Sequence, residues 1–239
     1  MNTNTLWRNS ANMHVGFFGL ALSIMMSGCA SVSQMALKKD SGPLDLSKKS
    51  IAVFTLRTSN QYKPAFQPNV RQVEITAGST GKEQGFRVGR AHAKSRDFYE
   101  YLVSVDLEPG VHTLRRVWGT SMNLMIIASF SFPVDETFEV PPNAVIYIGH
   151  MDMTNRKREE GEPRSGSLVP LVDQALAGFS GGTFDVTVSD RSATDIPLFV
   201  QTYPCLRDVQ IAKTLMRKCP DQSAVSKPEA PSNAPPRSE

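Results

Sequence analysis

The chain has 239 residues, of which 40% are hydrophobic and 21% are charged, and its formal net charge is +3. This composition is typical of a globular chain, and the length suffices for one sizeable domain or two small ones. Lys and Arg are dispersed without a run that would form a basic stripe, so bulk electrostatics do not indicate nucleic acid, and we expect no nucleic-acid partner.

The first 28 residues have the features of a secretory leader. They contain no Asp or Glu, and residues 15–26 form an apolar run. This run is too short to span a bilayer core as a helix, which takes about 20 residues, but it has the length of the apolar part of a signal peptide. Ser27 and Gly28 then supply small residues directly before Cys29. We therefore interpret residues 1–28 as a signal peptide.

The residues around Cys29 resemble a bacterial lipobox, in which the Cys thiol receives a lipid and becomes the first residue of the mature protein. The typical pattern has Leu three residues before the Cys, where Met26 of similar bulk stands here. The resemblance implies lipidation of Cys29, including palmitate, and stable anchoring in a membrane. Ala30, rather than Asp, follows Cys29. In this resemblance that choice favours the periplasmic face of the outer membrane. The alternatives are an ordinary signal peptide with a chance Cys and a cytoplasmic protein with a buried apolar N-terminal helix.

Two segments outside the leader are expected to lack a core. Residues 29–49 are polar, contain Gly and Pro and show no clear period, which predicts a tether between lipid and domain. Residues 220–239 contain five prolines and almost nothing apolar, which predicts disorder. The folded domain is therefore expected over residues 50–219.

Most of the expected domain has the period of two that indicates β-strands. The sequence predicts strands at 51–56, 70–76, 86–88, 99–107, 111–118, 124–132, 137–140, 144–153 and 182–189. Pro109 and Gly110 form the signature of a type II turn, so the strands on either side are expected to pair as a hairpin. Seven or more short strands with frequent turns favour a mainly β fold, an antiparallel β-sandwich.

Helical spacing of apolar residues is found only near the end of the expected domain. Residues 168–179 follow Ser167 as a possible N-cap, and residues 194–203 begin at Thr194 and end before Pro204. The sequence thus predicts one or two short C-terminal helices that cap the sandwich. Residues 208–216 leave helix and strand open.

The cysteine count suggests one disulfide bond. If Cys29 carries lipid, Cys205 and Cys219 remain, an even number in an oxidising compartment. A bridge between them would close a short loop and stabilise the fold by about 3 kcal/mol in the chain-entropy model. Two unpaired thiols are the alternative. A metal site is disfavoured, because no CxxC spacing or neighbouring His accompanies them.

A turn and a later strand carry a resemblance to known proteins. The matching residues are Leu107, Pro109, Gly110, His112 and Leu114, followed by Tyr147 and Gly149. With these residues the chain resembles a set of uncharacterised Gram-negative lipoproteins that have a small β-sandwich domain. The resemblance covers roughly 95–205. It implies the fold and the lipid anchor, and it implies no activity.

Two Gly-rich motifs superficially suggest catalysis or phosphate binding. Residues 178–182 match the G-x-S-x-G elbow of hydrolases, but that elbow needs a strand before the Ser and a helix after it, whereas the predicted order is the reverse. No His follows His150 to complete such a site. Residues 78–82 lack the first Gly and the final Ser or Thr of a phosphate-binding loop. Both motifs are interpreted as turns.

The stretch His150-Met151-Asp152-Met153 is the most suggestive for a metal. On a strand, His150 and Asp152 face one way and Met151 and Met153 the other. Paired Met sulfurs suit Cu(I), and His with Asp suits a harder divalent ion. Met at alternating positions is more often part of a core, so these four residues are weak candidates, and we expect neither a metal nor another cofactor.

Three residues are candidate ligand contacts. Arg116 and Trp118 share one face of a predicted strand, and with Tyr147 they form a set that could stack on a sugar. The alternative for Arg116 and Trp118 is a cation–π contact that covers the sheet.

The sequence shows no catalytic constellation, because it has no convincing carboxylate pair and its histidines are scattered at His14, His92, His112 and His150. We expect a non-enzymatic, lipid-anchored envelope module that is structural or binds an unknown envelope protein. The alternatives are a glycan- or peptidoglycan-binding module and an enzyme of unrecognised type, such as a hydrolase. An exposed apolar patch would favour the first, exposed aromatics along a groove the second, and a cleft that collects His92, His112 and His150 the third.

Overall fold

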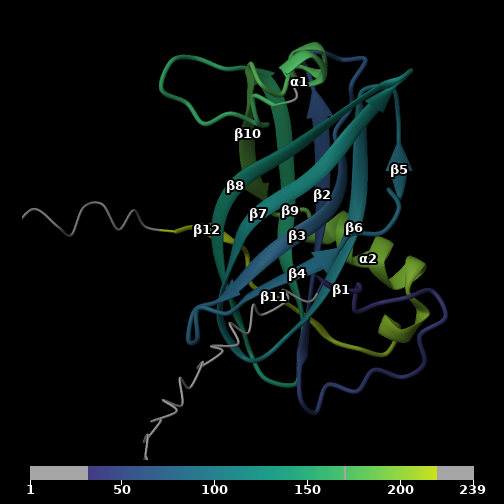
Figure 1. Ribbon diagram of the computed structural model, residues 1–239. Helices are drawn as coiled ribbons and strands as arrows, with labels where there is room; N and C mark the ends of the chain where they lie inside the picture. Colours follow the sequence, from purple (N-terminus) through teal and green to yellow (C-terminus); the bar gives the residue numbers. More distant parts are fainter. Residues whose placement is uncertain (1–31, 170, 220–239) are drawn as a thin grey trace, which may run out of the picture.

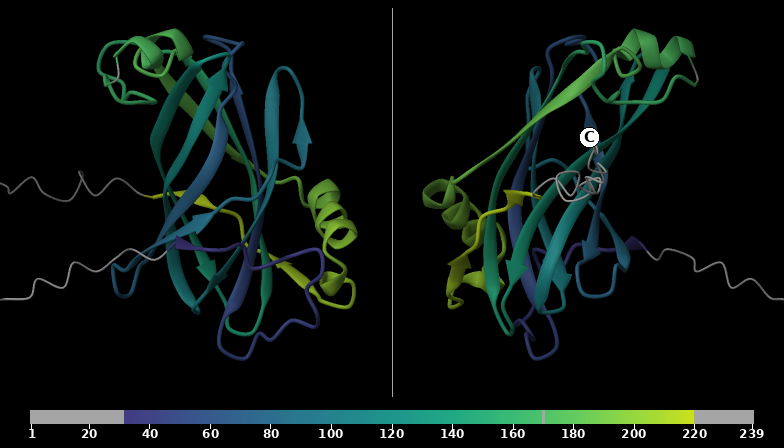
Figure 2. Two further views of the ribbon diagram at one scale, coloured as in Figure 1. Left: turned by 45° about the vertical axis from the view of Figure 1, so that its right-hand side comes forward. Right: turned by 90° about the vertical axis from the view of Figure 1, so that its left-hand side faces the viewer.

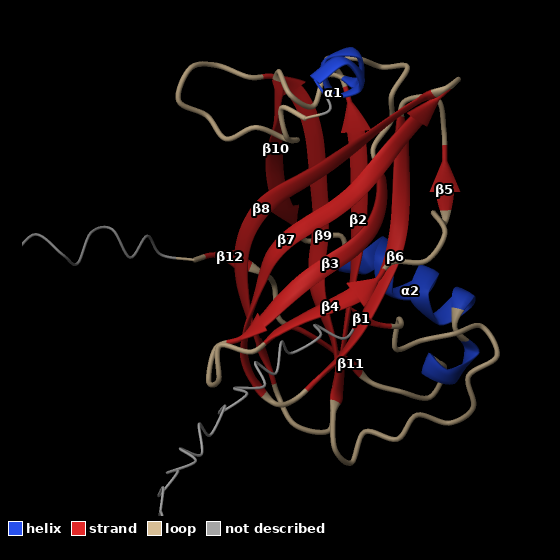
Figure 3. Ribbon diagram, in the orientation of Figure 1, coloured by secondary structure: helices blue, strands red, loops and turns tan. Residues whose placement is uncertain are grey.

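The computed structural model describes residues 32–169 and 171–219, which form two packed β-sheets with few helices (Figure 1, Figure 3). The mainly β, sandwich-like fold predicted from the sequence is confirmed. The predicted signal peptide, Cys29 and the predicted disordered tail at 220–239 lie outside the described residues.

The first sheet has the strand order β1-β4-β3-β7-β8-β12. Its strands are β1 (Val32–Ser33), β3 (Asn69–Ala77), β4 (Glu83–Arg87), β7 (Gly110–Asn123), β8 (Ile126–Val140) and β12 (Arg217–Lys218). All neighbours in this sheet are antiparallel except β1 and β4. The long strands β7 and β8 are joined by a hairpin loop of two residues, Leu124 and Met125.

The second sheet has the order β10-β9-β2-β6-β5, and β11 also pairs with β9. Its strands are β2 (Ser50–Asn60), β5 (Ala93–Lys94), β6 (Phe98–Leu107), β9 (Val145–Lys157), β10 (Gly182–Ser189) and β11 (Ile211–Lys213). β9 runs parallel to both β2 and β11. The expectation of an antiparallel sandwich therefore holds for most pairs and is wrong for these two and for β1 with β4.

The turn at Pro109 and Gly110 does not close a hairpin. β6 pairs with β2 and β5, whereas β7 pairs with β3 and β8, so the turn carries the chain from the second sheet to the first. Gly110 has a φ of 134°, which explains the need for Gly. The predicted change of chain direction is correct, but the predicted pairing of the two flanking strands is wrong. A Pro-Gly turn reverses the chain without determining which strands pair with each other.

The main core fills the space between the two sheets. Along β2, the residues Ala52, Phe54 and Leu56 face this core, while Ile51 and Val53 face outward into a second apolar cluster. β2 is thus buried on both faces, which requires a further layer over the outer face of the second sheet.

The helix α2 (Ser192–Thr202) and the short 3-10 helix at Pro204–Leu206 supply this layer, and Figure 2 shows α2 beside the sheet. Phe199 of α2 is fully buried there. α1 (Leu171–Ala177) lies at one end of the sandwich (Figure 1). Both predicted helices are therefore present, and residues 208–216 contain the short strand β11 and no helix. No helix in the described part of the chain is long and apolar enough to cross a membrane.

The segment expected to be a tether is part of the fold from residue 32 onward. After β1 pairs with β4 of the first sheet, the backbone N–H of Ala36 donates to Ser104 O of β6 in the second sheet at 3.0 Å. Leu37 is buried, and Lys49 forms an ion pair of 2.6 Å with Asp106. The prediction of a tether is wrong for residues 32–49, because a few apolar side chains dispersed among polar ones suffice to hold the segment on the domain.

The predicted disulfide is absent, and both thiols are unpaired in the structure. Cys205 packs beside the second cluster, on the outer face of the second sheet. Cys219 follows β12 at the edge of the first sheet, where its N–H donates to Asp135 O. Spacing alone suggested a short loop, but the intervening chain crosses from one layer to the other and carries the two cysteines apart.

The interior of β7 sets a strict limit on side-chain size. A methyl group at Gly119 would clash with Asn69 O and would lie 2.6 Å from the Phe130 ring. We expect Gly119→Ala to lower the free energy of unfolding by about 1–3 kcal/mol through overpacking, measured by urea denaturation. Gly42→Ala, at a position with open space, is the matched control and should change it by less than about 0.5 kcal/mol. Equal effects of the two substitutions would contradict this account.

Candidate functional site

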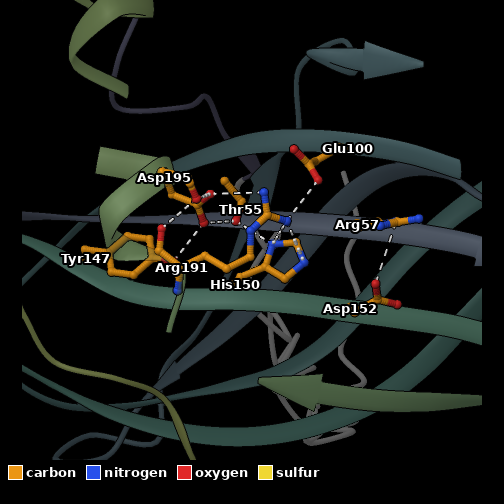
Figure 4. A network of polar contacts seen from close by, with 9 residues as sticks. Thr55, Arg57, Glu100, Tyr147, His150, Asp152, Arg191 and Asp195 are labelled. Atoms are coloured by element: carbon orange, nitrogen blue, oxygen red, sulfur yellow. Dashed lines mark hydrogen bonds and ion pairs between the residues drawn. The ribbon is translucent and has the colours of Figure 1, made fainter. Parts of the chain in front are cut away.

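The outer face of the second sheet carries a polar network beneath the N-terminal end of α2 (Figure 4). A bulge in β9 positions it: Gly149 has a φ of 120°, and the pairing of β2 with β9 shifts by one residue between Val53 and Thr55. The extra residue reverses which side chains face outward. Tyr147 and His150, three positions apart, therefore lie on the same outer face, beside Thr55.

The Asp195 carboxylate, from the first turn of α2, is the centre of this network. Its Oδ2 accepts hydrogen bonds from the Thr55 hydroxyl at 2.5 Å and from the Tyr147 hydroxyl at 2.7 Å. Its Oδ1 lies 3.4 Å from the guanidinium of Arg191, four residues earlier. This guanidinium compensates the buried charge of Asp195, and Arg191 also approaches Glu100 at 3.4 Å.

The hydrogen bonds fix the proton on His150. Thr55 has one hydroxyl proton, which it donates to Asp195, so it accepts from His150 Nδ1 across 2.7 Å. Burial and the nearby Arg191 guanidinium lower the pKa of His150, which favours the neutral ring. Burial and the adjacent Asp195 carboxylate raise the pKa of Tyr147, which keeps its proton in the bond to Asp195.

This arrangement resembles a catalytic triad only in its residue types. Thr55 lies between His150 and Asp195, whereas in a triad the His lies between nucleophile and carboxylate and activates the nucleophile. Thr55, Tyr147 and Asp195 are also fully buried. The network holds α2 on the sheet and offers no accessible nucleophile. Sequence reasoning missed it; the one local signal was a Thr at position 55 inside the apolar run that begins at Ile51.

The predicted ligand contacts do not come together. Arg116 and Trp118 lie on the outer face of the first sheet, where Trp118 is 38% exposed and Arg116 pairs with Glu74 at 3.4 Å. Tyr147 lies in the other sheet and is fully buried, so its selection as a ligand contact is wrong. The bulge at Gly149 and the α2 layer bury this ring, and a period-two pattern reveals neither.

The predicted metal candidates also separate. Met151 and Met153 are in the main core, as their alternation with His150 and Asp152 indicated. Asp152 lies 3.7 Å from Arg57 Nε, and His150 belongs to the network described above. No cluster of three or more His, Cys, Asp and Glu residues suited to a metal occurs among the described residues.

The remaining histidines and Gly-rich motifs have structural settings. His112 Nε2 contacts Glu108 O at 2.8 Å, while His92 lies on the loop before β5, so these two and His150 do not share a cleft. Residues 178–181 form the turn from α1 to β10, which begins at Gly182, and residues 78–82 lie in the turn from β3 to β4. Both motifs are turns, as predicted.

An exposed apolar surface occupies one end of the sandwich. At the β7–β8 loop, Leu124 is 90% exposed and Met125 95% exposed. The exposed neighbours are Met122 and Ile127 on the same hairpin, and Leu168, Val169, Val172 and Leu176 in and before α1. The hairpin tip and α1 lie at the same end of the molecule (Figure 1). We call this set of eight residues the apolar end.

No family model, curated protein or solved structure matches the chain. Inference about function therefore depends on the geometry of this chain alone.

The network makes Asp195 a critical residue for stability. We expect Asp195→Asn to lower the free energy of unfolding by about 2–4 kcal/mol, because Arg191 loses one of its two carboxylate partners and the amide places a donor where hydroxyls donate. Asp173→Asn in the first turn of α1 is the control and should cost less than about 0.5 kcal/mol. Urea denaturation measures both. A cost below about 1 kcal/mol for Asp195→Asn would show that the network does not hold α2.

His150 should make stability depend on pH. Because its pKa is lowered in the folded state, the unfolded chain takes up this proton first as the pH falls below about 6.5. The stabilisation is full above that pH and is lost as the pH falls, by no more than about 1.4 kcal/mol per pH unit. Urea denaturation between about pH 7.5 and about pH 5.5 should show a shallower dependence in His150→Gln than in the wild type. Identical slopes would contradict the prediction.

Proposed function

We propose that the protein is a non-enzymatic interaction module of the bacterial envelope, anchored by lipid on Cys29 at the periplasmic face of the outer membrane. In this proposal the apolar end binds an envelope protein that has an apolar surface of its own. The observation that carries the proposal is the exposure of Leu124 and Met125 at the tip of the β7–β8 hairpin.

The backbone at this tip is unfavourable for the residues that occupy it. Leu124 has a φ of 53°, and two-residue hairpin loops usually place Gly or Asn in such conformations. A non-Gly residue there costs about 1–2 kcal/mol. The chain thus tolerates strain and the exposure of two large apolar side chains at one site, although monomeric proteins rarely display large contiguous apolar patches. Selection for contact with a partner explains both costs.

The charges around the apolar end favour a protein over a lipid surface. Arg96 lines a shallow hollow together with Met122, and Asp97 follows it in sequence. Lys63 lies beside Gly178 at the end of α1, and Asp173 is in the first turn of that helix. An anionic membrane attracts basic residues, whereas an apolar centre with a rim of both signs is typical of protein interfaces.

The place of Cys29 in the sequence supports an orientation in which the apolar end points away from the membrane. In the sequence, Cys29 is three residues before Val32, where the described fold begins. Lipid on Cys29 would therefore hold the domain against the membrane. Figure 1 shows β1 in the half of the molecule away from α1, which leaves the apolar end free for a partner.

Leu124→Gly should separate stability from binding. We expect this variant to raise the free energy of unfolding by about 1 kcal/mol, since Gly adopts a positive φ without strain. We also expect it to reduce recovery of the partner at least fivefold when the lipoprotein is crosslinked in the envelope and purified. Met125→Ser should reduce recovery without the gain in stability.

The control for this experiment is Val111→Ser, which changes an exposed apolar residue at the opposite end of β7 and should leave recovery unchanged. Equal recovery with all four proteins would refute the role of the apolar end. Recovery of the chain itself as the principal crosslinked species would identify self-association and contradict the proposed partner. Comparison with Cys29→Ser tests the anchor: unchanged membrane association of that variant would refute lipidation as the attachment.

A further inference from the structure

A groove of about 580 Å³ lies at the seam that the N-terminal segment crosses between the two sheets. Residues 34, 35 and 37–39 and the segment from Arg87 to His92 form its sides, with Leu102 of β6 and Tyr203 after α2. A second hollow of about 450 Å³ adjoins it, and the loop Val88–Ala91 lines both.

The two hollows share a strong positive charge. Their basic residues are Lys38, Lys39, Arg71, Arg87, Arg90 and Lys94. No Asp or Glu is among the lining residues, and none of these six forms an ion pair within the described residues. The lining of the two hollows thus carries six positive charges and no carboxylate.

The larger groove combines this charge with an apolar floor. The floor is formed by Leu37, Val88 and Leu102, which are largely buried in the fold. Further apolar surface comes from Met35 and Tyr203. Ligand sites in proteins characteristically pair such apolar linings with a few polar groups that fix orientation. An apolar floor with cations above it suits a ligand that has one apolar end and one negatively charged end.

We propose that this groove binds an anionic amphiphile, a phosphate headgroup attached to an apolar chain. Arg87, Arg90 and Lys38 face the headgroup with charge-assisted hydrogen bonds, and the apolar chain lies along Leu37 and Leu102. A single-stranded nucleic acid would instead require a row of aromatic side chains on which bases stack. The lining of the groove has the Tyr203 ring and the His92 imidazole but no row of aromatic side chains, so it suits an acyl chain better.

Among anionic amphiphiles, we select an anionic phospholipid as the ligand of this groove. Gln34 and Met35 line the groove directly after β1, so it opens beside the point at which the N-terminus enters the fold. The choice of a phospholipid rests on the proposed anchor at Cys29, which would place the groove beside a membrane. The binding surface itself is different from the apolar end, and its binding can be measured without lipid on Cys29.

Binding can be measured on the unlipidated full-length Cys29→Ser protein by isothermal titration calorimetry. The probe is dihexanoyl phosphatidylglycerol below its micelle concentration, compared with dihexanoyl phosphatidylcholine and inorganic phosphate. We expect saturable binding of the phosphatidylglycerol, weakened by added salt, and at least tenfold weaker binding of the other two. Equal affinity for phosphatidylcholine would remove the role of the cations. Equal affinity for inorganic phosphate would remove the role of the apolar floor.

Two variants locate the site. The double substitution Arg87→Glu and Arg90→Glu should weaken binding at least tenfold, whereas Lys157→Glu, an exposed and unpaired control on β9, should leave it unchanged. Ala91→Trp keeps every charge and obstructs the groove, so it should also abolish binding. Thermal unfolding confirms that each variant is folded. Unchanged binding in a folded Ala91→Trp protein, or tighter binding of oligothymidylate than of phosphatidylglycerol, would overturn the proposal.

Discussion

The extra residue at Gly149 decides which side chains face which side of β9. With regular alternation, Ile148 and His150 would share one face and Tyr147 and Met151 the other. The bulge instead keeps Ile148 and Met151 in the main core and places Tyr147 and His150 on the outer face. Only a residue without a side chain adopts a φ of 120° readily, so Gly at this position determines both the composition of the core and the existence of the polar network.

The layer over the outer face follows from this arrangement. Tyr147 hydrogen-bonds Asp195 of α2, and the backbone N–H groups of Thr214 and Met216 donate to Tyr147 O and Ile148 O. The C-terminal segment thus passes the bulge before it joins the first sheet as β12. The N-terminal segment crosses the opposite seam from β1 to β6. Both open sides of the sandwich are therefore closed by chain ends, and the basic groove exists because one of these crossings leaves space beside the loop 88–91.

The sequence predicted what depends on local pattern. The presence of strands such as β6 and β9, the turn at Gly110 and the two helices were all predicted, because neighbouring residues encode them. Pairing is a tertiary property, so the assignment of β6 and β7 to one hairpin failed. The groove is also tertiary: Lys38 and Arg87 are far apart in sequence, and dispersed Lys and Arg gave no sign that the fold gathers them. Tyr147 was misjudged because its exposure depends on a helix that begins 45 residues later.

Asp195 and Leu124 each occupy an environment that is unfavourable for their residue type. The unfavourable environment is compensated by other contacts at Asp195 but not at Leu124. Asp195 is a buried charge, which is costly, but two hydroxyls and a guanidinium compensate it, so its setting is explained by stability. Leu124 combines a strained backbone with an exposed apolar side chain, and no described contact repays either cost. Natural sequences are consistent across levels except where function imposes a conflict. An uncompensated conflict at a hairpin tip, at the same end as the exposed face of α1, is therefore a better indicator of a binding surface than the buried cluster of His, Thr and Asp, although that cluster more closely resembles an active site.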